Sequence, residues 1–235
     1  MPPPPGQAEG AYGGVAAPPI TSDPPDHHWH RRLILPVFAP QAVAKYEQGT
    51  KDLCNALIDE FIDKGTADAA ADYAQHIPVR VISTMLGVPF DMEEEFTDWV
   101  RGVLENMHDL ERRKRSRQSI IEFFLAQVED RRKNPRENDL ITELLNTEVE
   151  GKKVPIEYVL GVCNLMLVAG IDTTWSAIGS VMWHMAQHPE HRKQLRENDD
   201  LWPTAIEELL RVYAPVTMAR IVDHDGVFQG CPMKA

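Results

Sequence analysis

The sequence has few cysteines, a deficit of basic residues, and no long uninterrupted apolar run. The three cysteines, Cys54, Cys163 and Cys231, lie far apart without a C-x-x-C pair, so neither a zinc site nor a disulfide scaffold is indicated, and a reducing compartment is expected. No basic residue precedes Arg31 and no apolar run reaches 18 residues, so the sequence predicts neither a secretory signal nor a membrane span. We expect a soluble, cytoplasmic protein.

The balance of charge disfavours one large class of partners. The 24 basic and 36 acidic side chains give a net charge of −12, and such a surface would repel the phosphates of nucleic acid. The 235 residues are 43% hydrophobic, which is enough for a substantial core. Length alone allows one large domain or two small ones.

The pattern along the chain predicts one mainly helical domain after a linker. The first 25 residues hold eight of the 18 prolines, so we assign residues 1–21 to a proline- and glycine-rich linker without its own core. Residues 22–235 form the domain. Periodicity predicts a first short helix from His27 onward, with Pro36 and Pro40 marking its end. Further helices are predicted over 41–64, 72–86 with Asp72 as the cap, 91–107, 112–133, 156–188, 189–196 and 201–213. Alternation predicts a small β element at the C-terminal edge, with strands at 216–222 and 227–230 and a turn at Asp225-Gly226.

The helix expected over residues 156–188 carries the most informative segment. Residues 159–171 are nearly all apolar, so this helix should be buried on most sides. Its middle reads Ala169-Gly170-Ile171-Asp172-Thr173-Thr174, where a carboxylate is costly unless it is paired or used. Gly170 could let a flat ligand approach the backbone, and a threonine bonded to the preceding turn could open the helix. Alternatively, Gly170 ends one helix and Asp172 or Thr173 caps the next.

Three groups of charged residues are further candidates for a functional role. Glu208 and Arg211 stand at i and i+3, where they can pair with each other and hold a third partner, although most such pairs are solvated. The group His27, His28, His30, Arg31 and Arg32 could bind carboxylates or phosphate, with a solvated face as the simpler interpretation. The basic run at 112–117 is interpreted as a solvated face.

The order and spacing of these motifs over residues 20–235 resemble the cytochromes P450, the haem-thiolate monooxygenases, particularly the soluble bacterial type. The resemblance implies a P450-like helical domain that binds haem b and hydroxylates a hydrophobic small molecule. It assigns His27, Arg31 and Arg220 to the haem propionates, Ala169 and Gly170 to the oxygen-binding groove, Asp172 and Thr173 to the proton relay, Glu208 and Arg211 to a structural pair, and Leu165, Val168 and Val216 to substrate contacts. It also implies O₂ and an electron-transfer partner such as a ferredoxin or reductase.

The sequence departs from the family pattern chiefly in its C-terminal part. The family's haem-ligating cysteine lies in a glycine-rich loop well downstream of the segment matched by Glu208, and none of Cys54, Cys163 and Cys231 has that context. We therefore expect the iron ligand to be outside this chain and predict no metal ligand within it. The interpretation is an internal fragment that is inactive alone. His28, where a threonine is usual, is a milder departure.

Two other classes of function remain open at this level. The chain could be a non-catalytic helical binding module, or a P450 relic, in which the charged groups are ordinary surface residues. It could also be another helical enzyme such as a terpene cyclase, which needs magnesium-binding carboxylates. Asp199-Asp200 is the candidate pair for that site, and it lacks the further spaced acidic residues.

Overall fold

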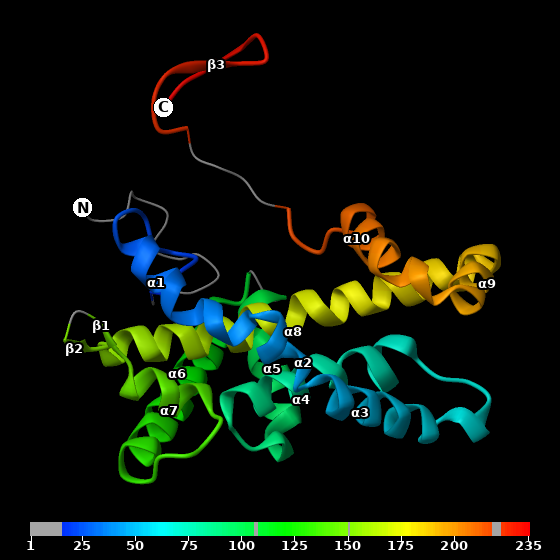
Figure 1. Ribbon diagram of the computed structural model, residues 1–235, viewed down its shortest axis with the longest axis horizontal. Helices are drawn as coiled ribbons and strands as arrows, with labels where there is room; N and C mark the ends of the chain where they lie inside the picture. Colours follow the sequence, from blue (N-terminus) through cyan, green and yellow to red (C-terminus); the bar gives the residue numbers. More distant parts are fainter. Residues whose placement is uncertain (1–15, 106–107, 150, 218–221) are drawn as a thin grey trace. The chain divides into compact units, whose positions relative to one another are not determined.

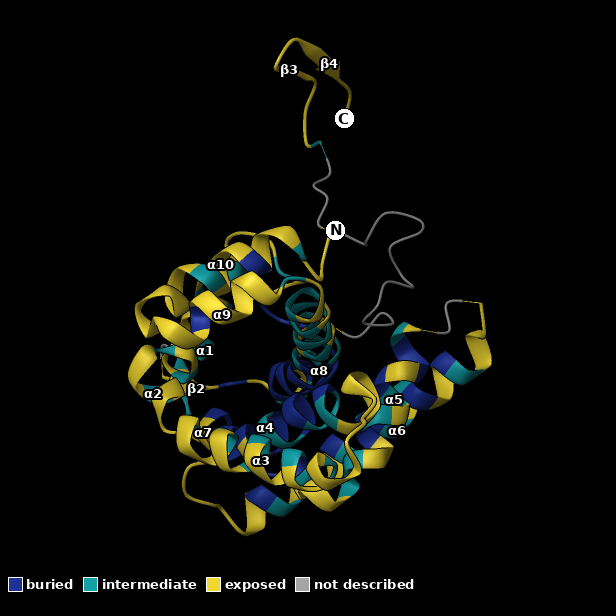
Figure 2. Ribbon diagram, turned by 90° about the vertical axis from the view of Figure 1, so that its right-hand side faces the viewer, coloured by how far each residue is buried: buried dark blue, intermediate teal, exposed yellow. Residues whose placement is uncertain are grey.

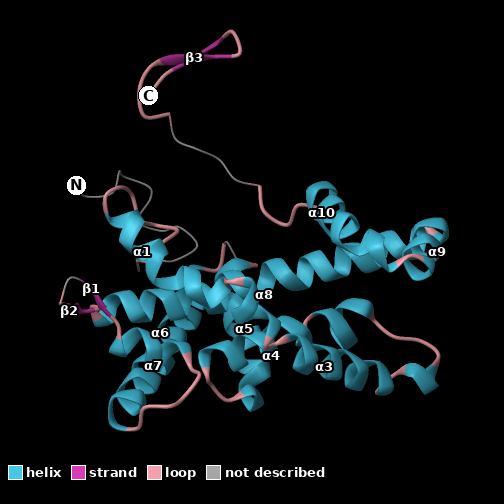
Figure 3. Ribbon diagram, in the orientation of Figure 1, coloured by secondary structure: helices cyan, strands magenta, loops and turns pink. Residues whose placement is uncertain are grey.

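The computed structural model describes residues 16–105, 108–149, 151–217 and 222–235. The α-helices are α1 Asp26–Ile34, α2 Pro40–Ala44, α3 Glu47–Asp59, α4 His76–Leu86, α5 Glu93–Leu104, α6 Leu110–Lys133, α7 Leu140–Asn146, α8 Ile156–Gln187, α9 Pro189–Glu197 and α10 Trp202–Val212. Short turns of helix are η1 Leu35–Phe38, η2 Ile62–Lys64, η3 Ala69–Ala74, η4 Phe90–Met92 and η5 Asp199–Leu201. The predicted mainly helical class is confirmed (Figure 1, Figure 3).

The described strands form two small antiparallel hairpins. In the first, β1 (Glu148–Val149) pairs with β2 (Lys152–Lys153), and in the second β3 (Gly226–Phe228) pairs with β4 (Cys231–Met233). The chain divides into two compact units, Met1–Trp183 and His184–Ala235, and each is described by itself below.

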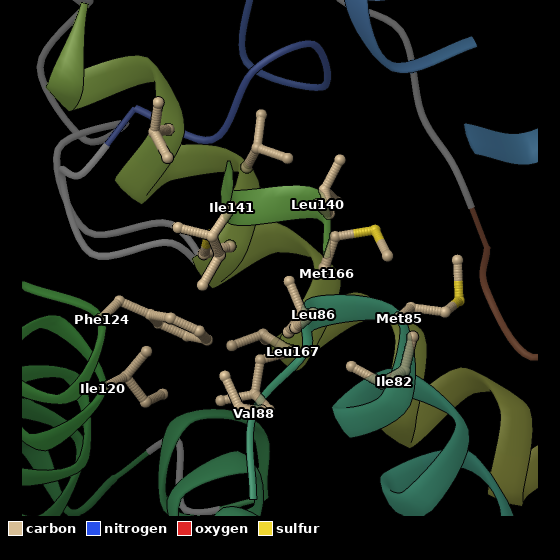
Figure 4. Close-up of a cluster of buried hydrophobic side chains, with 14 of the residues drawn as sticks. Ile82, Met85, Leu86, Val88, Ile120, Phe124, Leu140, Ile141, Met166 and Leu167 are labelled. Atoms are coloured by element: carbon tan, nitrogen blue, oxygen red, sulfur yellow. The ribbon is translucent and has the colours of Figure 1, made fainter. Parts of the chain in front are cut away.

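The core of the first unit forms where four helices converge (Figure 4). Leu86 of α4, Phe124 of α6, Ile141 of α7 and Leu167 of α8 are each at most 1% exposed and belong to one cluster. Full burial of a side chain of this kind contributes roughly 1.5–3 kcal/mol. The cluster therefore fixes α8 against α4, α6 and α7.

The long helix α8 runs without a break, as the apolar pattern predicts. It spans 32 residues, so the alternative in which Gly170 ends one helix is wrong. Most of its residues up to Ile171 are buried and those beyond are mostly half-buried or exposed (Figure 2). By length and composition alone α8 could cross a membrane, but 56% of its most apolar window is buried inside the protein, as in the core helix of a soluble protein.

The helix expected over 41–64 is divided into α2, α3 and η2. The break falls at Lys45 and Tyr46, and the Tyr46 side chain packs against the core cluster, so tertiary packing overrides the local helical pattern. Gly65 ends η2 with φ 69°, as its left-handed conformation favours glycine. Asp68, and not Asp72, caps the next segment, because Asp68 Oδ1 accepts hydrogen bonds from the amides of Ala70 and Ala71 at 2.8 and 3.0 Å.

The C-terminal hairpin turns later than predicted. Its turn is at Gln229 and Gly230, which have φ of 48° and 83°, whereas Asp225-Gly226 was expected. The expected strand at 216–222 includes 218–221, which lie outside the described residues; 216 and 217 are irregular. The short elements α7 and β1–β2 were not predicted.

The basic run at 112–117 is only partly a solvated face. Arg113 is 7% exposed and its Nε donates to the carbonyl of Val103 at 3.3 Å, while Arg112 pairs with Asp98 at 2.8 Å. Near the start of the chain, Ala17 is fully buried. Ala16 and Pro18 lie so close to Gly161 of α8 that a Cβ there would come within 2.4 Å of the Ala16 carbonyl oxygen.

Candidate functional site

The middle of α8 combines a satisfied hydroxyl with a closely packed glycine. Thr173 Oγ1 donates to the carbonyl of Ala169, one turn earlier, at 2.7 Å. This is the backbone bond that a helical threonine is expected to make. A Cβ on Gly170 would stand 2.7 Å from Ile82 Cδ1, so α4 packs against the helix there. The glycine thus has a packing reason that is independent of any ligand.

Asp172 lies half-buried beside these residues. Burial raises the pKa of its carboxyl, and a hydrogen bond with Trp175 opposes that shift. The Trp175 ring in turn lies 5.6 Å from the Arg101 guanidinium of α5, in a cation–π contact. A carboxyl with a raised pKa on a partly open helix face is suited to exchange protons with a neighbouring group.

An apolar cleft of about 700 Å³ borders the same stretch of α8. Gly170 and Thr174 line it from α8, together with residues of η1, α2, α3 and α4, among them Phe38, Val43, Tyr46, Ile77, Val81 and Met85. Asp172 and Thr173 are not among its lining residues.

Helix α1 presents Arg31 to solvent. The Arg31 side chain is exposed and makes no hydrogen bond or ion pair within the described part of the chain, and His27 is half-buried. The helix is attached to α8 through Tyr158, whose hydroxyl donates to the His30 carbonyl at 2.6 Å and whose ring stacks on Trp29 at 5.4 Å. An anchored helix with an uncommitted guanidinium is suited to bind a carboxylate.

Glu208 and Arg211 pair with each other in the second unit. Arg211 Nε and Nη2 donate to the two carboxylate oxygens of Glu208, each at 2.7 Å. The side chains are 58% and 70% exposed, and the described residues supply no third partner. The pairing predicted from the i, i+3 spacing is confirmed, and its bracing role stays a prediction.

The other predicted site residues differ in how far they are exposed. Leu165 and Ala169 are half-buried on α8, whereas Val168 is 3% exposed and packs in the core, so it has no open face for a substrate contact. Val216 is 49% exposed in the second unit. Arg220 lies outside the described residues. Burial raises the pKa of the Cys163 thiol to about 12.

Sequence reasoning missed a cluster of histidines in the second unit. The rings of His184, His188 and His191 lie with their centroids 4.3–5.2 Å apart. Their spacing of four and then three residues is the signal that could have found them, since it places side chains on one face of a helix.

Known proteins with similar sequences identify the family of this chain. A sequence profile described as Cytochrome P450 matches residues 13–235. The chain belongs to the cytochrome P450 family. Cytochrome P450 109 of Bacillus spizizenii is 32% identical over 226 residues, which cover 89% of this chain and 55% of that protein. Vitamin D(3) 25-hydroxylase of Pseudonocardia autotrophica is 28% identical over 219 residues, covering 92% and 54%.

Solved structures agree on the P450 fold. PksS of Bacillus subtilis 168 superposes with a TM-score of 0.88 at 26% identity, covering 96% of this chain and 58% of that one. Substrate-free CYP109E1 of Bacillus megaterium gives 0.86 at 28% identity, covering 99% and 62%. The chain spans about half the length of the curated relatives it matches, so it presents part of a P450 of the soluble bacterial type.

Membership of the family implies haem, and the described residues fit part of its environment. Arg31 offers a charge-assisted donor for a propionate. Ala169 and Gly170 leave room for a flat group to approach the backbone of α8, since neither carries a side chain larger than a methyl group. An axial thiolate is the part for which we find no candidate in the described chain.

Proposed function

We propose that this chain forms the distal part of a haem-thiolate monooxygenase that hydroxylates a hydrophobic small molecule, and that it is inactive by itself. The observation that carries the proposal is the half-open middle of α8, where Asp172 has a raised pKa and Thr173 is bonded to Ala169. Both groups lie at the positions that the family resemblance assigns to proton delivery.

Each group has a separate task in this mechanism. When bound, a haem-thiolate group would supply O₂ binding and O–O cleavage. Burial raises the pKa of the Asp172 carboxyl, so this carboxyl keeps a proton more readily than an exposed aspartate does. Thr173 Oγ1 donates its hydrogen to the Ala169 carbonyl, which leaves its lone pairs free to accept a hydrogen bond from a neighbouring donor. Asp172 is therefore the group of the two that can supply a proton, and Thr173 can orient the group that receives it.

The remaining assignments concern binding. Arg31 and His27 of α1, with Arg220, hold the propionates, while Glu208 and Arg211 brace the surrounding structure. Leu165 and Val216 supply apolar contacts to substrate, whereas Val168 is buried in the core. Two relatives support a hydrophobic substrate by their names, a vitamin D(3) hydroxylase and a CYP109E1 solved with testosterone. Electrons come from a ferredoxin or reductase in the cytoplasm.

Haemin titration of the chain tests the assignment of Arg31. The change Arg31→Gln should weaken haemin binding by about tenfold or more, because a hydrogen bond to a charged group contributes about 1.5–3 kcal/mol. Arg32→Gln is the matched control, since Arg32 is its exposed neighbour on α1 and the change removes the same charge. Binding is followed by haem absorbance. An equal loss of haemin affinity in both variants, or no loss in either, would contradict the assignment. The alternative of a non-catalytic helical binding module would then be favoured.

A further inference from the structure

The histidine cluster lies where α8 meets α9, inside the second unit. His184 is in the last turn of α8, His191 is in the first turn of α9, and His188 is the joint between them with φ −122° and ψ 73°. The amide of His188 bonds to the carbonyl of His184 and ends α8, whereas the amides of His191 and Arg192 bond to the carbonyl of His188 and begin α9. Across this bend the three rings lie together, with centroids 4.3–5.2 Å apart.

A carboxylate completes the cluster. Glu190 Oε1 lies 3.2 Å from His188 Nδ1 and 3.9 Å from His191 Nε2, and the ligand atoms of these three residues all lie within 4.8 Å of one another. Two ligands of a tetrahedral zinc ion stand roughly 3.4 Å apart, given bonds of about 2.1 Å. Small side-chain rotations would therefore bring the three donors onto one ion.

The second histidine–histidine contact orients one of these donors. His191 Nδ1 lies 2.9 Å from His184 Nε2, and His184 Nδ1 lies 2.8 Å from the hydroxyl of Tyr213 in the residue following α10. If His191 Nδ1 carries its proton and donates it to His184, then His191 Nε2 keeps its lone pair for a metal. His184 Nδ1–H then donates to the Tyr213 oxygen. Outer partners of this kind fix the tautomer of metal-binding histidines.

We propose that His188, Glu190 and His191 bind a divalent transition-metal ion of the zinc class, with His184 and Tyr213 as positioning residues. Two imidazoles and a carboxylate are a donor set that suits zinc and leaves a position for water. The three side chains are 41%, 60% and 48% exposed, so an ion reaches them from solvent. The bound ion would clamp the joint between α8 and α9, and this role is independent of the haem chemistry.

Calorimetric titration of the tag-free, metal-stripped chain with ZnCl₂ tests the site. We expect about one equivalent to bind, and His188→Asn and His191→Asn should each weaken binding by more than tenfold. His184→Phe should cost about 10–100-fold, as expected for an outer partner. His224→Asn is the control, because His224 is an exposed histidine of the same unit, 88% accessible, and the change should leave binding unchanged.

Two outcomes would overturn the proposal. One is a wild-type chain that binds zinc no better than the double variant His188→Asn/His191→Asn, and the other is an equal loss in His224→Asn. An NMR titration of the wild type alone tests the site without variants that could misfold. In an NMR titration, zinc should shift the ring resonances of His188 and His191 before those of His224, and simultaneous shifts of all three would count against the site.

Discussion

The hydroxyl of Thr173 and the carbonyl oxygen of Ala169 are 2.7 Å apart, one turn of α8 from each other. Because a carbonyl oxygen has two lone pairs, this bond does not require the helical bond of Ala169 to break. Removing the Thr173 hydroxyl by mutation should therefore cost the fold little stability. A chemical role of Thr173 can then be tested separately from a structural role.

We predict that Thr173→Val changes the free energy of unfolding by less than about 1.5 kcal/mol, the usual net contribution of one neutral hydrogen bond. Urea denaturation of the chain measures this, and Thr174→Val on the neighbouring exposed position is the control. A loss of more than about 3 kcal/mol in Thr173→Val alone would show that the residue is needed for the helix, and the proton-delivery assignment would lose its basis.

The raised pKa of Asp172 predicts a pH-dependent stability. A carboxyl whose pKa is higher in the folded state stabilises the fold below its unfolded value, near 3.8, and loses that contribution as the pH rises through the folded value. Asp172→Asn should therefore be more stable than the wild type at neutral pH, and the difference should shrink as the pH falls. Urea denaturation over a pH series measures it. Asp59→Asn, at an exposed carboxylate, should show no such trend, and a parallel trend in both variants would refute the prediction.

The sequence pattern predicted α8 and its position in the core, because a run of apolar residues bounded by Pro155 and Pro189 has few other solutions. Since Asp172 and Thr173 are on that helix, their neighbourhood followed from the same pattern. The Glu208–Arg211 pair followed from i, i+3 spacing alone. In each case the information is local in the sequence.

What could not be predicted depends on contacts between distant segments. The cleft beside Gly170 requires α2, α3, α4 and α8 to meet, and the sequence of any one of these segments does not predict that contact. Arg113 has the sequence environment of a solvated residue, yet it bonds to the carbonyl of Val103. The histidine cluster needs the backbone bend at His188 as well as the spacing, and a helix prediction that simply restarts at Pro189 does not give the bend.

A buried ion pair between α6 and α7 yields the largest expected change in stability. Arg131 Nε donates to Asp139 Oδ2 at 2.9 Å, and the two side chains are 0% and 3% exposed. Asp139 Oδ1 also caps α7 by accepting from the Thr142 amide at 2.6 Å. Asp139→Ala should lower the free energy of unfolding by about 3–5 kcal/mol, because it leaves a buried guanidinium with one partner fewer.

Chemical denaturation checks this value against Asp98→Ala, which breaks the exposed pair with Arg112 and should cost less than about 1 kcal/mol. Asp139→Asn retains the cap oxygen and should fall between the two. Similar losses in Asp139→Ala and Asp98→Ala would mean that the Arg131 pair does not hold α6 and α7 together.

Two glycines of α8 offer a matched test of how residues 16–21 are held. A Cβ at Gly161 would approach the Ala16 carbonyl oxygen to 2.4 Å and Pro18 Cδ to 2.7 Å, while a Cβ at Gly179 would meet nothing within 4 Å. Both changes to alanine favour the helix by up to about 1 kcal/mol. Gly179→Ala should therefore raise the free energy of unfolding. Gly161→Ala should instead displace the early segment, and limited proteolysis should cut near Ala17 faster in that variant than in the wild type. Equal proteolysis of the two variants would show that residues 16–21 do not depend on the close approach to α8.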